Sequence, residues 1–367
     1  MGKIKYLCIA MLLFISFVLV FYTGCAAGED NDDAGSLEDQ IRGVIQPHVK
    51  VGAMVGVIHR GSRLVFSFGN KTREGDNPPD GNTVFEIGSI TKTFTGILLA
   101  HMHVSGIVNQ DDPVGGYLAA PEVTMPSHNG VEITLKHLAA HLSGLPKLPP
   151  DMGPLEEYPY LTYSVQDMYD FLNGYSLTRT PGSEYLYSNI GMGLLGHTLG
   201  LIDGTNYQDL LAREIFSALG MTRSSVFLTP AQESNLAAGH DADLTVTHSW
   251  DSQDCLQGAG AIKSCLNDLF IYMEVNIGLR PSLLASAMEL SHRSVFTIQS
   301  GQSTGLGWGL YEMPGQNILW HNGITAGYTS YMGFNKELAN GVIILFNHFD
   351  GPSWEVGERI LSILKDN

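Results

Sequence analysis

A serine and a lysine one helical turn apart are the first residues in this chain that could carry out chemistry. They lie in the segment Phe85-Glu-Ile-Gly-Ser89-Ile-Thr-Lys92, which opens a long apolar run. A serine hydroxyl is a weak nucleophile until a base removes its proton, and a lysine in an apolar helix can have a pKa low enough to be that base. A second Ser-x-x-Lys match, at 362–365, has no glycine turn before it. We therefore expect Ser89 to be the nucleophile.

A tyrosine and an asparagine form the second candidate, in the segment Tyr187-Ser-Asn189. A phenolate at Tyr187 could accept the proton of Ser89, and the amide of Asn189 could hold a substrate carbonyl. Taken alone, this pattern is more typical of a core tyrosine followed by a turn-forming asparagine. Its interpretation therefore depends on the other motifs.

The third candidate is His321-Asn322-Gly323, which lies in a strand pattern near the C-terminal end. The two other His-x-Gly matches, at His59 and His128, look like turn sequences. In a strand, a glycine permits another backbone to come close. We expect Gly323 to let a substrate backbone approach the sheet edge.

The elements that must position these residues fall into two groups along the chain. Strand patterns cluster at the two ends, and helical patterns lie between them. The predicted strands are Val51–Ile58, Leu64–Gly69, Gly307–Tyr311, Asn317–His321, Thr329–Phe334 and Val342–Asn347. The predicted helices are Leu37–Val44, Thr91–Val104, Thr134–Leu142, Val165–Leu172, Gly191–Leu199, Tyr207–Leu219, Leu266–Asn276 and Trp354–Leu364.

This arrangement predicts an α/β (α+β) fold in which both chain ends form one antiparallel sheet with flanking helices. The domain is expected to cover residues 37–365, with its sheet part at 37–88 and 291–365 and an inserted helical region at 89–290. Ligand sites favour the seam between two such parts. We expect the three motifs to meet there.

Composition limits the classes of function. The chain has 367 residues, of which 44% are apolar, so it can bury a core and is not a disordered protein. Its net charge of −17 argues against a nucleic-acid binder, which needs a basic face. His137 and His141 have the spacing of a zinc site, but Leu138 stands where metalloprotease chemistry needs a glutamate. We therefore expect these two histidines to have structural roles.

The N-terminus has the pattern of a secretory signal peptide over residues 1–24, with two early lysines, an apolar run and small residues at its end. Cys25 follows Thr23-Gly24, which resembles the lipobox of bacterial lipoproteins, although Tyr22 stands where leucine is usual. Residues 25–36 are small and acidic and predict a flexible tether. An uncleaved N-terminal anchor is the alternative. Either reading predicts an exported, membrane-anchored protein, with a periplasmic-facing lipoprotein as the preferred form.

Two further cysteines, Cys255 and Cys265, would remain in the mature chain. An oxidising compartment permits a disulfide between them. Their spacing does not decide the matter, because a disulfide needs a specific geometry. The sequence leaves a bridged pair and two free thiols open.

In order and context, the three motifs resemble those of the penicillin-recognising serine hydrolases, above all the class C β-lactamases and penicillin-binding-protein-like relatives. The segments Ile133–Pro146, Gly258–Ser264 and Gly305–Trp308 also fit this family. The resemblance covers residues 40–365, essentially the whole mature chain. It implies the β-lactamase/transpeptidase-like fold.

The resemblance also implies a role for each matched residue. Ser89 would be the acylated nucleophile, and Lys92 its proton acceptor or electrostatic partner. Tyr187 would act in acylation and in activating the hydrolytic water, and Asn189 would hold the acyl-amide side of the substrate. The backbone N–H groups of Ser89 and Ile324 would form the oxyanion hole. The resemblance implies no metal or organic cofactor. Whether Lys92 or Tyr187 is the principal base stays open, because the two titrate as a coupled pair.

One departure from the family affects the substrate. Where β-lactamases and D,D-peptidases have Lys-Thr-Gly, this chain has His321-Asn322-Gly323. An ordinary histidine is mostly neutral at pH 7 and offers no permanent charge to a substrate carboxylate, whereas Asn322 can still donate a hydrogen bond. The substrate could be a β-lactam, a D-amino-acid peptide of peptidoglycan type or an ester. A non-hydrolytic peptidoglycan or β-lactam sensor is the alternative from another functional class.

Overall fold

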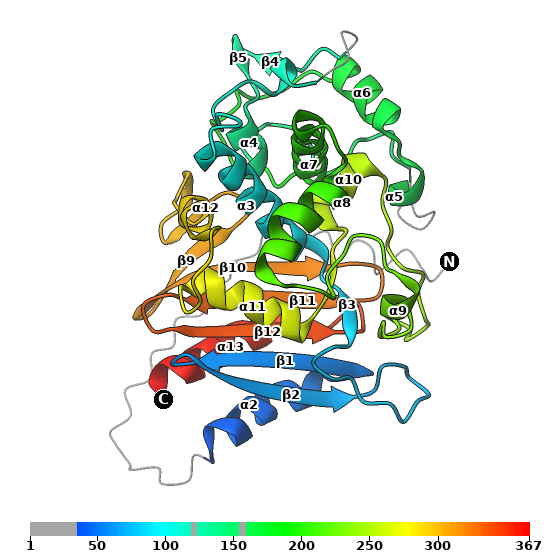
Figure 1. The fold of residues 1–367 in the computed structure, drawn as a ribbon, viewed down its shortest axis with the longest axis vertical. Helices are drawn as coiled ribbons and strands as arrows, with labels where there is room; N and C mark the ends of the chain where they lie inside the picture. Colours follow the sequence, from blue (N-terminus) through cyan, green and yellow to red (C-terminus); the bar gives the residue numbers. More distant parts are fainter. Residues whose placement is uncertain (1–34, 119–122, 154–158) are drawn as a thin grey trace. The chain divides into compact units, whose positions relative to one another are not determined.

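An eight-stranded antiparallel sheet forms the centre of residues 37–367 in the computed structural model, which describes residues 35–118, 123–153 and 159–367 (Figure 1). Its strand order is β2-β1-β12-β11-β10-β9-β8-β7. The bounds are β1 Gly52–His59, β2 Ser62–Gly69, β7 Phe296–Gln299, β8 Gln302–Thr304, β9 Gly309–Met313, β10 Gln316–Ile324, β11 Thr329–Asn335 and β12 Asn340–Phe346.

Strands from the two ends of the described chain pair directly with each other near one edge of this sheet. β1 pairs with β12 in a register that joins Ala53 to Phe346 and Ile58 to Gly341. β1 and β2 form a hairpin whose turn residues Arg60 and Gly61 both have positive φ, of 48° and 81°. Two positive φ angles are what a two-residue turn needs to match the twist of its strands. The prediction of one sheet built from both chain ends is confirmed.

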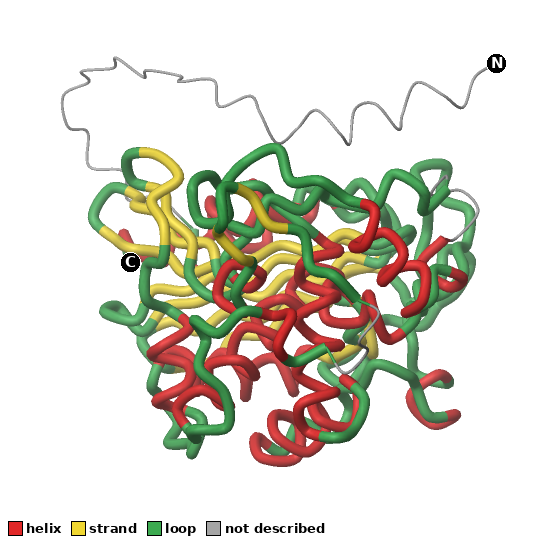
Figure 2. The backbone as a smooth tube through the Cα atoms, turned by 90° about the horizontal axis from the view of Figure 1, so that it is seen from above, coloured by secondary structure: helices red, strands yellow, loops and turns green. Residues whose placement is uncertain are grey.

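Helices cover both faces of the sheet, and each face has its own core. On one face, α2 (Leu37–Ile45) and α13 (Ser353–Asp366) pack on the inner strands through Ile41, Ile360 and Leu361. On the other face, α3 (Thr91–Val104) and α11 (Leu266–Ile277) belong to the larger hydrophobic cluster, which continues into the helical region. Figure 2 shows the strands as one layer with most of the helices on one side of it.

Between β2 and β7 the chain forms mostly short helices and two small two-stranded sheets. β3 (Val84–Glu86) pairs with β6 (Lys263–Cys265), and β4 (Ser127–His128) pairs with β5 (Val131–Glu132). The other helices are α4 Leu135–Ala139, α5 Pro159–Thr162, α6 Val165–Gly174, α7 Asn189–Asp203, α8 Tyr207–Leu211, α9 Pro230–Glu233, α10 Asp254–Gly260 and α12 Ala285–Ser291. Short 3-10 turns lie at Gln46–His48, Gly88–Ile90 and Val114–Gly116.

Two predicted helices differ from the structure. The helix predicted at Thr134–Leu142 ends at Ala139, because His141 has a φ of +60°, which a right-handed helix excludes. The helix predicted at Tyr207–Leu219 is helical over its whole length, but its hydrogen bonds are of the π type over Ala212–Ser217, after α8. The short helices α10 and α12 and the strands β7 and β8 have no counterpart in the sequence-based prediction.

Cys255 and Cys265 are both free, buried thiols, so the disulfide that the sequence left open is absent from the structure. Cys255 belongs to α10, where its thiol donates a hydrogen bond to the Tyr163 carbonyl oxygen. Cys265 ends β6 opposite Val84. The two cysteines thus belong to different elements and face different partners.

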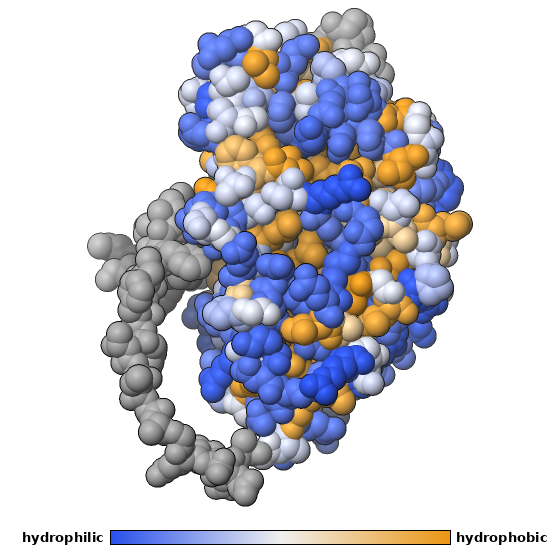
Figure 3. Space-filling model, turned by 90° about the vertical axis from the view of Figure 1, so that its left-hand side faces the viewer, coloured by the Kyte–Doolittle hydropathy of each residue, from blue (hydrophilic) through white to orange (hydrophobic). Residues whose placement is uncertain are grey.

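The predicted signal peptide and its cysteine, Cys25, lie outside the described residues. Within the part of the chain that the structure describes, no helix is both long and apolar enough to cross a bilayer. Hydrophilic side chains cover most of the face seen in Figure 3, and hydrophobic ones are interspersed among them. Such a mixture is ordinary for a protein surface in contact with water.

Candidate active site

Ser89 lies in the short 3-10 turn Gly88–Ile90, which joins β3 to the long apolar helix α3. Gly88 has a φ of +51°, a conformation that glycine adopts at little cost. The turn therefore changes the chain direction sharply just before the helix begins. Ser89 remains partly exposed there, whereas its neighbours Gly88 and Ile90 are buried.

Lys92 lies one turn further along α3 and has no exposed surface. Its Nζ is 2.9 Å from the Ser89 Oγ and donates a hydrogen bond to the carbonyl oxygen of Ala259. Burial, with the nearby positive charge of Lys147, holds the pKa of Lys92 well below its ordinary value of 10.5. A neutral amine in contact with a serine hydroxyl can accept its proton.

Tyr187 completes this contact. Its ring centroid is 4.9 Å from the Lys92 Nζ, and its hydroxyl shares a hydrogen bond with Ser89. Although Tyr187 keeps part of its surface exposed, desolvation by the surrounding protein raises its pKa, and this outweighs the opposing effect of the Ser89 hydrogen bond. The phenol is therefore uncharged near neutral pH. The phenolate considered from the sequence is disfavoured in this environment.

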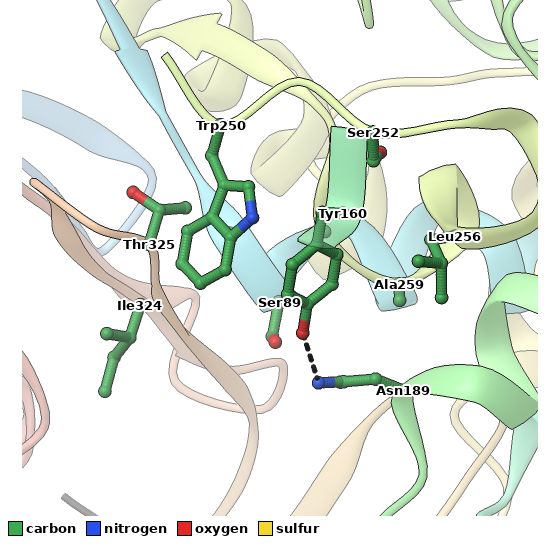
Figure 4. A pocket seen from close by; sticks show the side chains of 11 residues that line it. Ser89, Tyr160, Asn189, Trp250, Ser252, Leu256, Ala259, Ile324 and Thr325 are labelled. Carbon is green, nitrogen blue, oxygen red and sulfur yellow. Dashed lines mark hydrogen bonds between the residues drawn. The ribbon is translucent and has the colours of Figure 1, made fainter. Parts of the chain in front are cut away.

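Asn189 is the first residue of α7, where the side chain of Ser188 caps the helix by accepting the Gly191 N–H. The Asn189 Nδ2 donates a hydrogen bond to the Tyr160 hydroxyl over 3.3 Å. In Figure 4 the Tyr160 ring lies between Asn189 and Trp250, and the two rings meet edge to face with centroids 4.8 Å apart. Asn189 therefore carries one side of an aromatic wall beside the nucleophile.

A pocket opens beside Ser89 at the seam between the sheet and the helical region, as the sequence predicts (Figure 4). The end of β10 lines it on the sheet side, and α5, α7, α10 and the loop before α10 line it on the other side. Its lining residues are Gly88, Ser89, Tyr160, Asn189, Trp250, Ser252, Leu256, Ala259, Gly260, Ile324 and Thr325.

The His321-Asn322-Gly323 segment lies beside the pocket rather than in its lining. His321 is buried, with its ring centroid 6.3 Å from that of Tyr187, and its Nδ1 is 2.6 Å from the Asn322 carbonyl oxygen. Burial and the charge of Lys92 lower the pKa of His321 to about 3. The histidine that replaces the family's lysine is therefore neutral.

Gly323 has a packing role that the sequence did not indicate. A Cβ atom at Gly323 would lie 2.0 Å from the Ile87 carbonyl oxygen and 2.5 Å from the Ser330 Oγ. Gly323 is therefore needed to pack β10 against the turn that carries Ser89. Side chains alternate along a strand, so Asn322 lies on the sheet face opposite to Gly323.

The two backbone groups expected to form the oxyanion hole are neighbours. A Cβ atom at Gly88 would lie 2.8 Å from the Ile324 nitrogen, which places that nitrogen beside the nucleophile turn. β10 extends beyond its pairing with β9, which ends at Trp320. The edge of β10 from His321 to Ile324 thus faces the turn and not another strand.

The two histidines with zinc-like spacing have different surroundings and different hydrogen-bond partners. His137 caps α4, accepting the Thr134 N–H at its Nδ1, which is the structural role expected. His141 is buried, accepts the Ser188 N–H and lies against Tyr187 with centroids 4.4 Å apart. Among the described residues, no group of three His, Cys, Asp or Glu side chains is placed to hold a metal ion.

Sequence reasoning missed the aromatic wall. Tyr160 and Trp250 are separated by ninety positions in the chain, and neither belongs to a motif. The available signal was Trp250 itself, a large aromatic in the otherwise polar stretch 247–254. An isolated aromatic in a polar loop indicates a binding surface more often than a core contact.

The chain is similar to known proteins over most of its length. A family model described as beta-lactamase matches residues 41–363. A beta-lactamase of Pseudomonas fluorescens is 28% identical over 283 residues, which cover 76% of this chain and 74% of the relative. The D-alanyl-D-alanine-carboxypeptidase/endopeptidase AmpH of Escherichia coli K12 is 27% identical over 309 residues, which cover 80% and 78%.

Solved structures confirm the predicted fold. A class C beta-lactamase has a TM-score of 0.79 at 24% identity, with 92% of this chain and 98% of that chain covered. A beta-lactamase/D-alanine carboxypeptidase from Yersinia pestis, complexed with citrate, has a TM-score of 0.78 at 23% identity, with 90% and 98% covered.

Proposed function

Since the chain belongs to the beta-lactamase family of serine hydrolases, we propose that it cleaves amide or ester bonds through an acyl-enzyme on Ser89. The observation that carries this proposal is the contact of 2.9 Å between the Ser89 Oγ and the Nζ of a fully buried Lys92. A base held at this distance can remove the hydroxyl proton as the oxygen attacks a carbonyl carbon.

In the proposed acylation step, neutral Lys92 accepts the Ser89 proton and the Oγ attacks the substrate carbonyl. The backbone N–H groups of Ser89 and Ile324 stabilise the resulting oxyanion. Tyr187, uncharged and hydrogen-bonded to Ser89, passes a proton to the leaving group and receives the Lys92 proton in return. Water then attacks the acyl-Ser89 ester, with the same groups acting in reverse. Asn189 holds the acyl-amide side of the substrate.

Catalytic activity and its dependence on Ser89 can be tested together. We expect the purified chain to release product from a chromogenic cephalosporin or from p-nitrophenyl butyrate, and Ser89→Ala to lose at least about a thousandfold in kcat/KM. A transient mass increase on the wild-type chain would show the acyl-enzyme directly. Wild-type rates equal to those of Ser89→Ala on both substrates, with no adduct on Ser89 and no release of D-alanine from a peptide ending in D-alanyl-D-alanine, would refute the proposal.

The same assay separates the candidate substrates. Fast cephalosporin turnover would indicate a β-lactamase, and ester turnover alone would indicate an esterase-like relative. Release of D-alanine from a peptide ending in D-alanyl-D-alanine would indicate a peptidase. A stable adduct on Ser89 without turnover would support the alternative function, a sensor that traps its acyl-enzyme.

Neutral His321 favours substrates that do not depend on a charged carboxylate clamp. We therefore expect His321→Lys to raise kcat/KM for an anionic cephalosporin relative to p-nitrophenyl butyrate by about tenfold, because a charge-assisted hydrogen bond contributes about 1.5–3 kcal/mol. His321→Gln, which adds no charge, is the matched control. An unchanged ratio in His321→Lys would show that no substrate carboxylate comes near this position.

We also propose that the protein is exported and held at a membrane by a lipid on Cys25. The support is the signal-peptide pattern of residues 1–24 and the cysteine that follows it. Wild-type protein should incorporate radiolabelled palmitate, partition with membranes and resist extraction by salt. Cys25→Ser should not incorporate the label. Equal labelling of both proteins would contradict acylation at Cys25.

A further inference from the structure

A buried carboxylate lies immediately before the nucleophile turn and has no part in the reaction described above. Glu86 ends β3, three residues before Ser89, and only 3% of its surface is exposed. Its Oε1 accepts two hydrogen bonds, from the Trp250 N–H over 2.6 Å and from the Ser249 hydroxyl over 3.0 Å. Both donors belong to the loop that carries Trp250 into the pocket.

The same loop is attached a second time at its next residue. Asp251 pairs with Lys263 over 2.5 Å, and Lys263 also donates a hydrogen bond to the Val226 carbonyl oxygen. Lys263 is 1% exposed and stands opposite Glu86 in the pairing of β3 with β6. Three consecutive loop residues, 249–251, are thus bound to Glu86 of β3 and Lys263 of β6, the two strands that pair just before Ser89.

These attachments fix the position of the Trp250 ring. The ring meets Tyr160 edge to face, and Tyr160 accepts the Asn189 amide hydrogen bond. A continuous series of contacts therefore runs from Glu86 through Trp250 and Tyr160 to Asn189. A shift of the Trp250 backbone would displace the wall against which an acyl group packs.

The electrostatic surroundings keep Glu86 able to accept these hydrogen bonds. Burial raises its pKa, whereas the charge of Lys263, the Thr325 hydroxyl, the Trp250 N–H and the Ser249 hydroxyl favour its ionised form. The negative charge of Glu86 in turn helps to raise the pKa of Tyr328, which packs nearby. Either protonation state leaves Oε1 with lone pairs for the loop.

We propose that Glu86 is a positioning residue that holds the Trp250 loop, and through it the aromatic wall of the pocket, in the place that accepts bulky acyl groups. The inference rests on the proposed function of the pocket as the acyl site. Glu86 does not line the pocket, so it acts through Trp250 and not on the substrate. It therefore sets which acyl groups bind, and leaves the proton transfers at Ser89 to Lys92 and Tyr187.

The kinetic test compares a small with a bulky acyl group, p-nitrophenyl acetate with p-nitrophenyl phenylacetate. We expect Glu86→Ala to raise the KM for the phenylacetyl ester about three- to tenfold, the range that loss of an ordered aromatic contact predicts. The kcat for both esters should fall less than threefold. Glu86→Gln keeps an oxygen acceptor at the same position and should restore the KM. The exposed Glu74→Ala is the matched control.

A second measurement reports the loop without any need for catalysis. The chain has four tryptophans, so the difference between each protein and its Trp250→Phe counterpart isolates the fluorescence of Trp250. Acrylamide should quench this signal more strongly in Glu86→Ala than in wild type, and equally in Glu86→Gln and wild type. This result would stand even if both esters proved inert and the proposed function failed.

Three outcomes would overturn the inference. One is unchanged quenching of Trp250 in Glu86→Ala. Another is an equal fall in kcat for both esters with no change in the KM ratio, which would place Glu86 at the nucleophile turn. The third is a Glu86→Gln variant as impaired as Glu86→Ala, which would make the charge and not the hydrogen bonds responsible.

Discussion

At the scale of single residues, the site is organised around one lysine, Lys92, whose pKa the surrounding protein lowers. Lys92 is surrounded by Tyr187, His141 and His321, and all three are uncharged because burial opposes their ionised forms. The Lys92 charge also lowers the pKa of both histidines. A proton added at any one of these groups makes protonation of the others less favourable, so the cluster behaves as one titrating unit.

Lys147 adds to this electrostatic control from an exposed position. It is exposed, and its carbonyl oxygen accepts the backbone N–H of Asn189. Its positive charge lowers the pKa of Lys92 further. Because Lys92 accepts a proton only when neutral, activity should be present above its pKa and lost below it. Lys147→Gln should raise that pKa and move the acidic limb of the kcat/KM profile to higher pH.

The measurement is kcat/KM against pH for p-nitrophenyl butyrate, a substrate that does not titrate. Lys147→Arg keeps the charge and should leave the limb where it is in wild type. High salt should reduce the difference between wild type and Lys147→Gln, because Lys147 is exposed and its charge is screened. A limb that moves to lower pH in Lys147→Gln would contradict the role of Lys92 as the base.

At the scale of elements, the site depends on the close approach of a turn and a strand edge. The turn Gly88–Ile90 and the end of β10 contact each other through two glycines, Gly88 and Gly323. Neither position has room for a methyl group. The oxyanion hole needs two backbone N–H groups a few ångströms apart, and only backbones in contact can supply that spacing.

Gly323→Ala tests this packing. The new methyl group would overlap the Ile87 carbonyl oxygen, so the strand must move away from the turn. We expect kcat to fall at least about a hundredfold, the usual loss when one oxyanion donor is misplaced, and the free energy of unfolding to fall by about 1–3 kcal/mol. Enzyme assays and urea unfolding measure the two effects.

Gly43→Ala is the matched control for this substitution. Gly43 lies within α2, and no atom lies within 4 Å of the place that a methyl group would take there. An alanine there should stabilise the helix by about 0.5–1 kcal/mol and leave kcat unchanged. A Gly323→Ala variant with wild-type kcat would show that the β10 edge does not form the oxyanion hole.

Elements with strong local patterns could be predicted, and those defined by distant contacts could not. The apolar strands β11 and β12 and the helix α3 follow from hydrophobic runs, and α3 has the predicted bounds. β7 alternates apolar and polar residues, but it has only four residues and is largely exposed, so its pattern is too short to predict a strand. Ser89, Lys92, Tyr187 and Asn189 were found because their types and order resemble a family.

The remaining features of the site depend on contacts that no local pattern records. The hydrogen bond between Glu86 and Trp250 spans 164 positions. That between Asn189 and Tyr160 spans 29. The contact of Gly323 with Ile87 likewise requires β10 to be placed against β3 first. A sequence read by periodicity shows which face of an element is apolar but not which distant residue that face meets.

At the scale of the whole molecule, the two faces of the sheet have separate hydrophobic cores. The site lies on the helical side of the sheet, whereas α2 and α13 pack a second core on the opposite face. Several histidines are buried without charge on the site's side, among them His292, which lies between Trp308 and Phe334. Burial lowers the pKa of His292 and of His321 to about 3. Below pH 6.5 the unfolded chain therefore takes up protons at these two histidines, whereas in the folded protein they stay neutral.

This difference predicts a loss of stability in mild acid. Between pH 6.5 and 3 the unfolded chain binds more protons at these histidines than the folded one, so the free energy of unfolding falls as the pH is lowered through that window. Each histidine contributes at most about 1.4 kcal/mol per pH unit. Urea unfolding at pH 7 and pH 5 measures the difference, and His292→Gln should reduce it by the share of one histidine.

Leu361→Ala is the control that separates this titration from a general weakening of the fold. Leu361 is fully buried in α13, on the face away from the histidines. Its truncation should cost about 2–5 kcal/mol at both pH values, because no titrating group changes its surroundings. The difference between pH 7 and pH 5 should therefore remain that of wild type in Leu361→Ala and be smaller only in His292→Gln. If His292→Gln kept the full wild-type difference, His292 would have to be protonated in the folded protein at pH 5, and burial alone would not govern its charge.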